Sequence, residues 1–282
     1  MTTTLPPVPA RLSVPGSLAV ARACCPPECF AYHAAWRFFR RTGLKGHPGW
    51  HVGLLRRLVA EQPPSPGPVR VLICAASDEA MLACLTRVLD PDRLRVQMLD
   101  ACPTPLVLAS AYAARHGIAL TTRRHRVPGL PDFDAPFDIA VTDGLLSLLP
   151  RPGQRSELLG QIAARLAPGG LFVYTTRIAG PSGVLEYDRL GRVVQALAAR
   201  VAWRGPVEER RRMARQVLGK VSRPSPFTSP AQLTEAVAEH FAEVRTFVRR
   251  SPASLPVHAH RLLHGEAGTC VGISATVPRR AA

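Results

Sequence analysis

Short apolar runs that alternate with helical patterns are the feature of this sequence that most constrains its fold. Expected strands cover residues 69–74, 94–100, 118–127, 137–142 and 171–178, and expected helices cover residues 79–89, 104–117 and 153–170. Strands that alternate with helices in units of roughly 20–30 residues imply parallel pairing and right-handed crossovers. The pattern therefore predicts an open, doubly wound α/β sheet with helices on both faces.

The C-terminal part of the sequence predicts a different ending for this sheet. A helix is expected to begin after Ser229, with Pro230 in its first turn, and to lead into a strand near residues 244–249. Residues 269–278 read as a last strand. A helix, a strand, a loop and a strand suggest an antiparallel hairpin at the edge, so we expect a mostly parallel sheet of seven strands in an α/β fold.

The rest of the chain divides by composition. Residues 1–29 are rich in proline and small residues and are expected to be a disordered tail, followed by an N-terminal helical cap at residues 30–62. The Pro-rich stretch at residues 61–68 reads as a linker into the main domain, residues 63–282. Residues 179–223 are helical by pattern and are expected to be an insertion over one end of the sheet.

The formal net charge of +16 admits nucleic acid or an anionic membrane surface as a partner. Only Lys45 and Lys220 are lysines, and the basic residues spread along the chain, which favours compositional drift as the origin of the charge. No RNA-binding motif or aromatic stacking cluster supports a nucleic-acid partner. No apolar run reaches ~18 residues, so we expect no membrane span, and with no clear secretion signal we expect a cytoplasmic protein.

Seven cysteines without a secretion signal predict reduced thiols. Cys25, Cys29 and His33 follow one another at four-residue steps. A metal site would need a fourth ligand and usually a tighter pair spacing, and no second cysteine pair follows in the sequence. We therefore expect no metal.

The loop after the first strand is where a doubly wound sheet would hold a ligand. It consists of Ala75, Ala76, Ser77 and Asp78 and contains no glycine. These small side chains leave room for a ligand but not the freedom for positive φ that glycine provides. Asp78 argues against a diphosphate, which needs a glycine-rich nest without a carboxylate, and suits a cofactor that is cationic near the loop.

Asp100 closes the second expected strand, 22 residues after Asp78. An acidic residue at this place can accept both hydroxyl protons of an adenosine ribose. The alternative is that Asp100 caps the turn that follows it.

Taken together, these segments resemble the class I S-adenosylmethionine-dependent methyltransferases over residues 69–178 and, more loosely, 229–278. "VRVLICAASDEAML" stands at the first motif of that family, and "VQMLD" matches its acidic second strand. "FDIAVTDGLLSLLP" matches the fourth-strand segment, and "LLGQIAARLAPGGLFVYTT" matches the helix, the Pro-Gly-Gly turn and the fifth strand. The departure from the family is the first motif, where Ala75 and Ser77 replace the usual glycines.

The resemblance implies S-adenosyl-L-methionine as the cofactor and a set of residues around it. The methionine part would lie on the loop, with Asp78 near the amino group and Asp100 on the ribose hydroxyls. The full set of cofactor-binding residues that the resemblance implies is Cys74, Ala75, Ala76, Ser77, Asp78, Asp100, Ala101, Cys102, Arg126, Val127, Thr142, Asp143 and Gly144. The residues near the adenine would be Ala101, Cys102, Arg126 and Val127. The residues that face the sulfonium and the acceptor would be Thr142, Asp143 and Gly144.

The implied activity is methyl transfer to an acceptor, for which a small molecule is favoured over RNA. A sulfonium is already activated, so the protein mainly has to position and desolvate the reactants. An acceptor hydroxyl or amine can need a base, and the candidates are His33, Asp143, Tyr187 and His258, none of them singled out. A non-catalytic cofactor-binding or regulatory module is the main alternative, and an NAD-binding reductase is disfavoured by Asp78 and the missing glycines.

Overall fold

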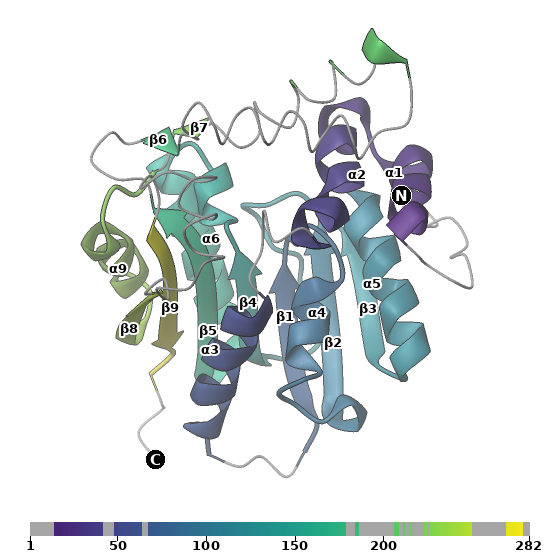
Figure 1. Ribbon diagram of the computed structural model, residues 1–282. Coiled ribbons are helices and arrows are strands. Elements are labelled where there is room, and N and C mark those ends of the chain that lie inside the picture. The colour runs from purple at the N-terminus through teal and green to yellow at the C-terminus, as the bar shows by residue number, and fades with distance from the viewer. Residues whose placement is uncertain are drawn as a thin grey trace.

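The structure of the chain is a computed structural model, and it describes residues 14–41, 48–63, 67–178, 184–185, 206–208, 211, 215, 223–224, 226–249 and 269–278. Its centre is a seven-stranded sheet in the order β3-β2-β1-β4-β5-β9-β8 (Figure 1). The strands are β1 (Val69–Cys74), β2 (Leu94–Asp100), β3 (Ala119–Arg124), β4 (Phe137–Asp143), β5 (Leu166–Ile178), β8 (Ala242–Val248) and β9 (Thr269–Thr276).

The first five of these strands pair in parallel, and β9 pairs antiparallel with both β5 and β8. The expected doubly wound sheet with an antiparallel edge hairpin is therefore confirmed. Residues 71–74 of β1 are buried on both faces of the sheet, as an inner parallel strand requires. The edge strand β3 instead alternates between exposed and half-buried residues.

Helices cover both faces of the sheet (Figure 1). On one face, α3 (Pro48–Ala60), α4 (Ala80–Leu85) and α5 (Pro103–His116) share a core with β1 and β2 that includes Leu55, Leu82 and Leu106. On the other face, α6 (Pro152–Arg165) and α9 (Pro230–Ala238) share a core with β4 and β5 that includes Leu158 and Leu233.

The turn between α6 and β5 shows where helical periodicity misled the sequence analysis. The expected helix over 153–170 ends at Arg165, and the Pro-Gly-Gly segment already belongs to β5. Gly169 has a φ of 78°, and a Cβ on Gly170 would lie 2.7 Å from the carbonyl oxygen of Ala167. The two glycines allow a close turn that redirects the chain into the sheet.

The expected disorder of residues 1–29 is wrong for the part that the structure describes. Residues 14–24 form α1 (Val14–Cys24), and α2 (Pro27–Arg41) begins within the supposed tail. Val20 is buried against Val107 and Leu108 of α5, so tertiary packing outweighs the Pro-rich composition. Pro27 is compatible with a helix because it stands at the first position. Residues 1–13 lie outside the described part.

Most of the expected insertion, residues 179–223, lies outside the described residues. Its two ends are described as β6 (Val184–Leu185) and β7 (Arg223–Pro224), which pair antiparallel. The start and the end of this segment therefore lie side by side (Figure 1). None of the helices that the structure describes is long and apolar enough to cross a membrane.

Candidate functional site at the carboxyl edge of the sheet

The carboxyl ends of β1, β2 and β4 lie next to one another because these three strands are neighbours in the sheet. The strand order reverses between β1 and β4, and in open α/β sheets ligands bind outside the carboxyl ends at such a point. The strands end at Cys74, Asp100 and Asp143. The topology thus brings together three of the four segments from which the sequence analysis drew its candidates.

The loop after β1 contains a residue with positive φ although it contains no glycine. Ala75 has a φ of 57°, in the left-handed region that costs a non-glycine residue roughly 1–2 kcal/mol. The Ala75 N–H donates to the carbonyl oxygen of Leu99 at 2.8 Å, which ties the loop to β2. The expectation that alanine lacks access to positive φ here is therefore wrong: the surrounding contacts hold the strained turn in place.

The last two residues of the loop, Ser77 and Asp78, contact different elements. The Ser77 hydroxyl lies 2.6 Å from the Tyr32 hydroxyl, and the Ser77 carbonyl oxygen lies 3.1 Å from Nδ1 of His33, both on α2. Asp78 is buried, and its Oδ1 accepts the Ala80 N–H at 3.0 Å at the start of α4. Ser77 therefore joins the loop to the N-terminal helices, while Asp78 helps to begin α4.

Asp100 is a buried carboxylate that organises the loops around it. Its Oδ1 accepts the Cys102 N–H at 2.7 Å, and its Oδ2 accepts the Ala76 N–H at 3.0 Å. Burial raises the pKa of Asp100 to about 6, against the opposing effect of the two N–H donors. The cap on the following turn is confirmed, and each carboxylate oxygen keeps a further lone pair for a ligand hydroxyl.

The residues expected near the adenine come from the loops after β2 and β3. The His125 N–H donates to the carbonyl oxygen of Asp100 at 2.8 Å, which places the start of the β3 loop beside the end of β2. Arg126 is exposed, and Val127 packs against the core of the α6 face. Ala101 is half-buried, and its carbonyl oxygen accepts from Nε of Arg124 at 3.1 Å.

The end of β4 carries a chain of polar groups. The Thr142 hydroxyl donates to the carbonyl oxygen of Cys74, which joins β4 to β1. Gly144 has a φ of 68°, and its N–H donates to the carbonyl oxygen of Thr175 at 2.7 Å. The Thr175 hydroxyl in turn donates to Oδ1 of Asp143 at 2.7 Å. Asp143 is therefore held by β5, while its side chain is 44% exposed to solvent.

The sequence analysis did not identify His51, which extends this hydrogen-bonded network at the end of β4. His51 of α3 places Nε2 3.0 Å from Oγ1 of Thr175 and 3.8 Å from Oδ1 of Asp143. The Thr175 hydroxyl already donates its hydrogen bond to Asp143, so Nε2 of His51 donates to Oγ1 of Thr175. The sequence places His51 only on the apolar face of a helix, and its partner Thr175 is 124 residues away, so no local signal identifies it.

Three thiols and an imidazole gather beside the loop after β1. Cys25 lies between α1 and α2, Cys29 and His33 lie on α2, and Cys102 stands at the N-cap of α5. Sγ of Cys102 lies 3.4 Å from Sγ of Cys25 and 3.5 Å from Sγ of Cys29. The resemblance placed Cys102 near the adenine, and in the structure the thiol of Cys102 contacts the other two cysteines.

The protonation of this cluster follows from its shared hydrogen bonds. The thiols of Cys25 and Cys29 lower the pKa of Cys102 below its usual range, and the pKa of Cys25 is raised in return. Burial lowers the pKa of His33, but hydrogen bonds to Cys102 and Cys29 outweigh it and raise the pKa to about 10. The favoured arrangement therefore holds negative charge on Cys102.

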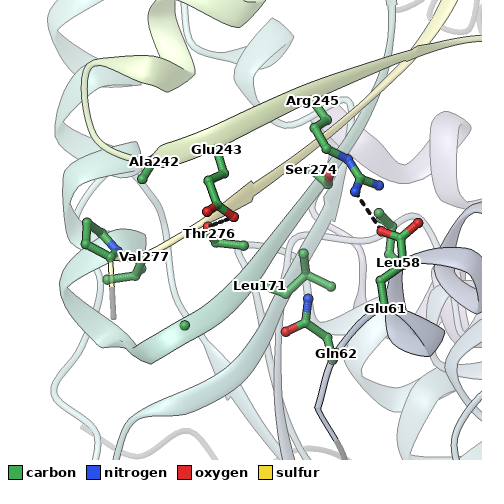
Figure 2. Close-up of a pocket in the computed structure, with 12 residues that line it drawn as sticks. Leu58, Glu61, Gln62, Leu171, Ala242, Glu243, Arg245, Ser274, Thr276 and Val277 are labelled. Atoms are coloured by element: carbon green, nitrogen blue, oxygen red, sulfur yellow. Dashed lines mark hydrogen bonds and ion pairs between the residues drawn. The ribbon is translucent and has the colours of Figure 1, made fainter. Parts of the chain in front are cut away.

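A cavity of about 470 Å³ lies away from all of these residues, between the end of α3 and the strands β5, β8 and β9 (Figure 2). Arg245 and Glu61 form an ion pair of 2.7 Å across it. Leu171 and Thr276 pair with each other and line the cavity, and Leu171 also pairs with Ile139 near the start of β4, so the cavity lies at the amino end of the parallel strands. None of the residues that the sequence analysis selected lines it.

No protein-family model matches the sequence, and no curated protein matches it either. Among solved structures, the chain is similar to an O-methyltransferase family protein from Burkholderia thailandensis, with a TM-score of 0.51, 14% identity and coverage of 90% of this chain and 60% of that one. It is also similar to phosphoethanolamine N-methyltransferase 2 of Haemonchus contortus, in complex with phosphomonomethylethanolamine and S-adenosylhomocysteine, with a TM-score of 0.51, 12% identity and coverage of 95% and 61%.

A third similar structure is a possible exported protein from Bordetella parapertussis, with a TM-score of 0.51, 20% identity and coverage of 80% of this chain and 67% of that chain. This chain spans about 60% of the length of the two methyltransferases. The order of the strands and the antiparallel strand β9 indicate the same fold as the similarity to these two methyltransferases. The chain has the fold of the class I S-adenosylmethionine-dependent methyltransferases.

Proposed function

We propose that the chain binds S-adenosylmethionine at the carboxyl edge of its sheet and transfers the methyl group to a small-molecule acceptor. The observation that carries this proposal is the loop after β1. Ala75 takes a left-handed conformation that favours glycine, and the loop is tied to Asp100 through the Ala76 N–H. The glycine-free loop therefore adopts, at Ala75, the left-handed conformation that glycine favours, which supports the proposal.

Different residues at this edge would bind different parts of the cofactor. The segment from Cys74 to Asp78 would hold the methionine part, and Asp100 would accept the ribose hydroxyls on its remaining lone pairs. Thr142, Asp143 and Gly144 would face the sulfonium. The cofactor supplies a methyl group that is already activated, so these residues mainly orient it against the acceptor and exclude water.

Asp143 is the group best placed to accept a proton from the acceptor. Its side chain is partly exposed at the edge, while Thr175 and His51 fix its orientation from behind. A positioned carboxylate at this place could act as the general base for a hydroxyl or an amine. His51 would then be a positioning residue that acts through Thr175.

Methyl transfer can be tested without knowing the acceptor. The full chain is incubated with methyl-labelled S-adenosylmethionine and a fractionated small-molecule extract, and the labelled fractions are identified. We expect label in a small-molecule fraction, at least ~10-fold less with Asp143→Asn, and unchanged transfer with the exposed-residue control Asp132→Asn. Transfer of label to RNA or protein alone would contradict the proposed acceptor class.

A non-catalytic cofactor-binding module is the second candidate, and one observation favours it. Ser77 is joined to Tyr32 and His33 of α2. The N-terminal helices thus lie against the loop that would hold the cofactor (Figure 1). Cofactor binding without any methyl transfer would favour this candidate over the enzyme.

A further inference from the structure

Four side chains that are distant in sequence offer metal-binding atoms within one small volume. One ligand atom each from Cys25, Cys29, His33 and Cys102 lie within 4.8 Å of one another. Donors at ~2.0–2.3 Å around a tetrahedral zinc ion lie roughly 3.3–3.8 Å apart, and the two sulfur–sulfur distances at Cys102 are 3.4 and 3.5 Å. We propose that these four residues form a structural zinc site.

The orientation of His33 supports metal binding. Nδ1 of His33 lies 3.1 Å from the carbonyl oxygen of Ser77, so that nitrogen is the one that carries the hydrogen. Metal-bound histidines commonly donate their second N–H to a carbonyl, which fixes the tautomer and leaves the other nitrogen for the metal. His33 is 6% exposed, so its ring is held in this orientation by packing as well.

The thiols have partners that suit thiolate ligands. Cys102 stands at the N-cap of the 14-residue helix α5, where the positive end of the helix dipole stabilises a negative charge. Oγ1 of Thr104 lies 2.9 Å from Sγ of Cys25 and can donate to it once the thiol loses its proton. Binding of Zn²⁺ would release to solvent the protons of the Cys25 and Cys29 thiols and the proton on the second ring nitrogen of His33, without any oxidation or reduction.

The geometry favours one ion over an iron–sulfur cluster. A cluster of two irons binds its ligands in two pairs on separate metals, so the ligand atoms lie farther apart than around one ion. All four atoms here fit around a single centre. Three thiolates and one imidazole complete a tetrahedral shell, which leaves no open position and identifies the site as structural rather than catalytic.

The proposed zinc would join elements that are 77 residues apart in the sequence. Cys25, Cys29 and His33 belong to the N-terminal helices, whereas Cys102 follows β2 directly after Asp100 and Ala101. A bound ion would therefore fasten α1 and α2 to the edge that carries the proposed cofactor site. The assignment of the zinc site does not depend on methyl transfer, because its ligands and its test are separate.

The test measures zinc content and thiol protection in the full chain, purified under reducing conditions. We expect about one zinc per chain, and alkylation followed by peptide mass spectrometry should show Cys25, Cys29 and Cys102 protected until a chelator removes the metal. Cys102→Ser should lower zinc affinity at least ~10-fold. Cys24→Ser is the matched control and should keep the zinc, because Cys24 is outside the cluster.

Three results would overturn the proposal. The first is no uptake of Zn²⁺, or of Co²⁺ as a spectroscopic probe of thiolate ligation, by the reduced wild-type chain. The second is full retention of zinc by Cys102→Ser. The third is a Cys25–Cys102 disulfide in place of the metal under reducing conditions, detected as the loss of two hydrogens. The wild-type measurements remain decisive even where a variant fails to fold.

Discussion

Ala75 is a residue whose backbone strain follows from the loop it occupies. Its φ of 57° costs alanine roughly 1–2 kcal/mol, which glycine would avoid. Ala75→Gly should therefore stabilise the chain by about 1 kcal/mol, even though glycine has more freedom in the unfolded state. Ala76→Gly is the control, because Ala76 has no positive φ, and it should lose roughly 0.5 kcal/mol. Urea unfolding measures both, and a loss of stability in Ala75→Gly would contradict the assigned conformation.

Asp100 has a structural role, of which the sequence indicated the cap on the following turn but not the hydrogen bond from Ala76. Asp100→Ala removes the acceptor of two N–H groups and should destabilise the chain by about 2–4 kcal/mol. Asp100→Asn keeps one acceptor oxygen and should lose less stability. Equal unfolding free energies for wild type and Asp100→Ala would show that the two hydrogen bonds contribute nothing.

At the scale of elements, α3 covers the sheet and supplies His51. A Cβ on Gly272 of β9 would lie 2.7 Å from Cδ2 of Leu54, so the helix packs directly on the antiparallel hairpin. Leu55→Ala should lower the free energy of unfolding by about 2–5 kcal/mol because Leu55 is 2% exposed in the core. Leu148→Ala, at a side chain that is 55% exposed, should stay within about 0.5 kcal/mol. Thermal unfolding of the two variants compares them, and similar losses would contradict the packing of α3.

Elements with a strong local pattern could be predicted from the sequence. The bounds of β1 and β2 match the expected strands because β1 is a short apolar run broken only by Arg70, and β2 begins with alternating apolar and polar residues. Helix α1 and the extension of α2 to Pro27 could not be predicted. Val20 is buried by packing against Val107 and Leu108 of α5, which are distant in the sequence. The same limit applies to the thiol cluster: three of its members are close in sequence, and only the fold adds Cys102.

At the scale of the whole molecule, the strand order determines where the chemistry can take place. It brings the ends of β1, β2 and β4 to one edge, and the N-terminal helices lie beside that edge (Figure 1). The described cavity at the opposite end, between α3 and the antiparallel hairpin, is separate from it (Figure 2). The sequence could predict the segments of the edge, but the approach of His51 to Thr175 depends on how α3 crosses the sheet.

Calorimetric titration of the full chain with S-adenosylmethionine and S-adenosylhomocysteine tests the central claim most directly. The account predicts binding at one site, weakened at least ~10-fold by Asp100→Asn, a loss of about 1.4 kcal/mol or more. Ala75→Leu should abolish the binding because its larger side chain fills the path along the loop, whereas Glu243→Gln, in the distant cavity, should leave it unchanged. No heat from either ligand with folded wild-type protein, or equal binding by all three variants, would contradict a cofactor site at this edge.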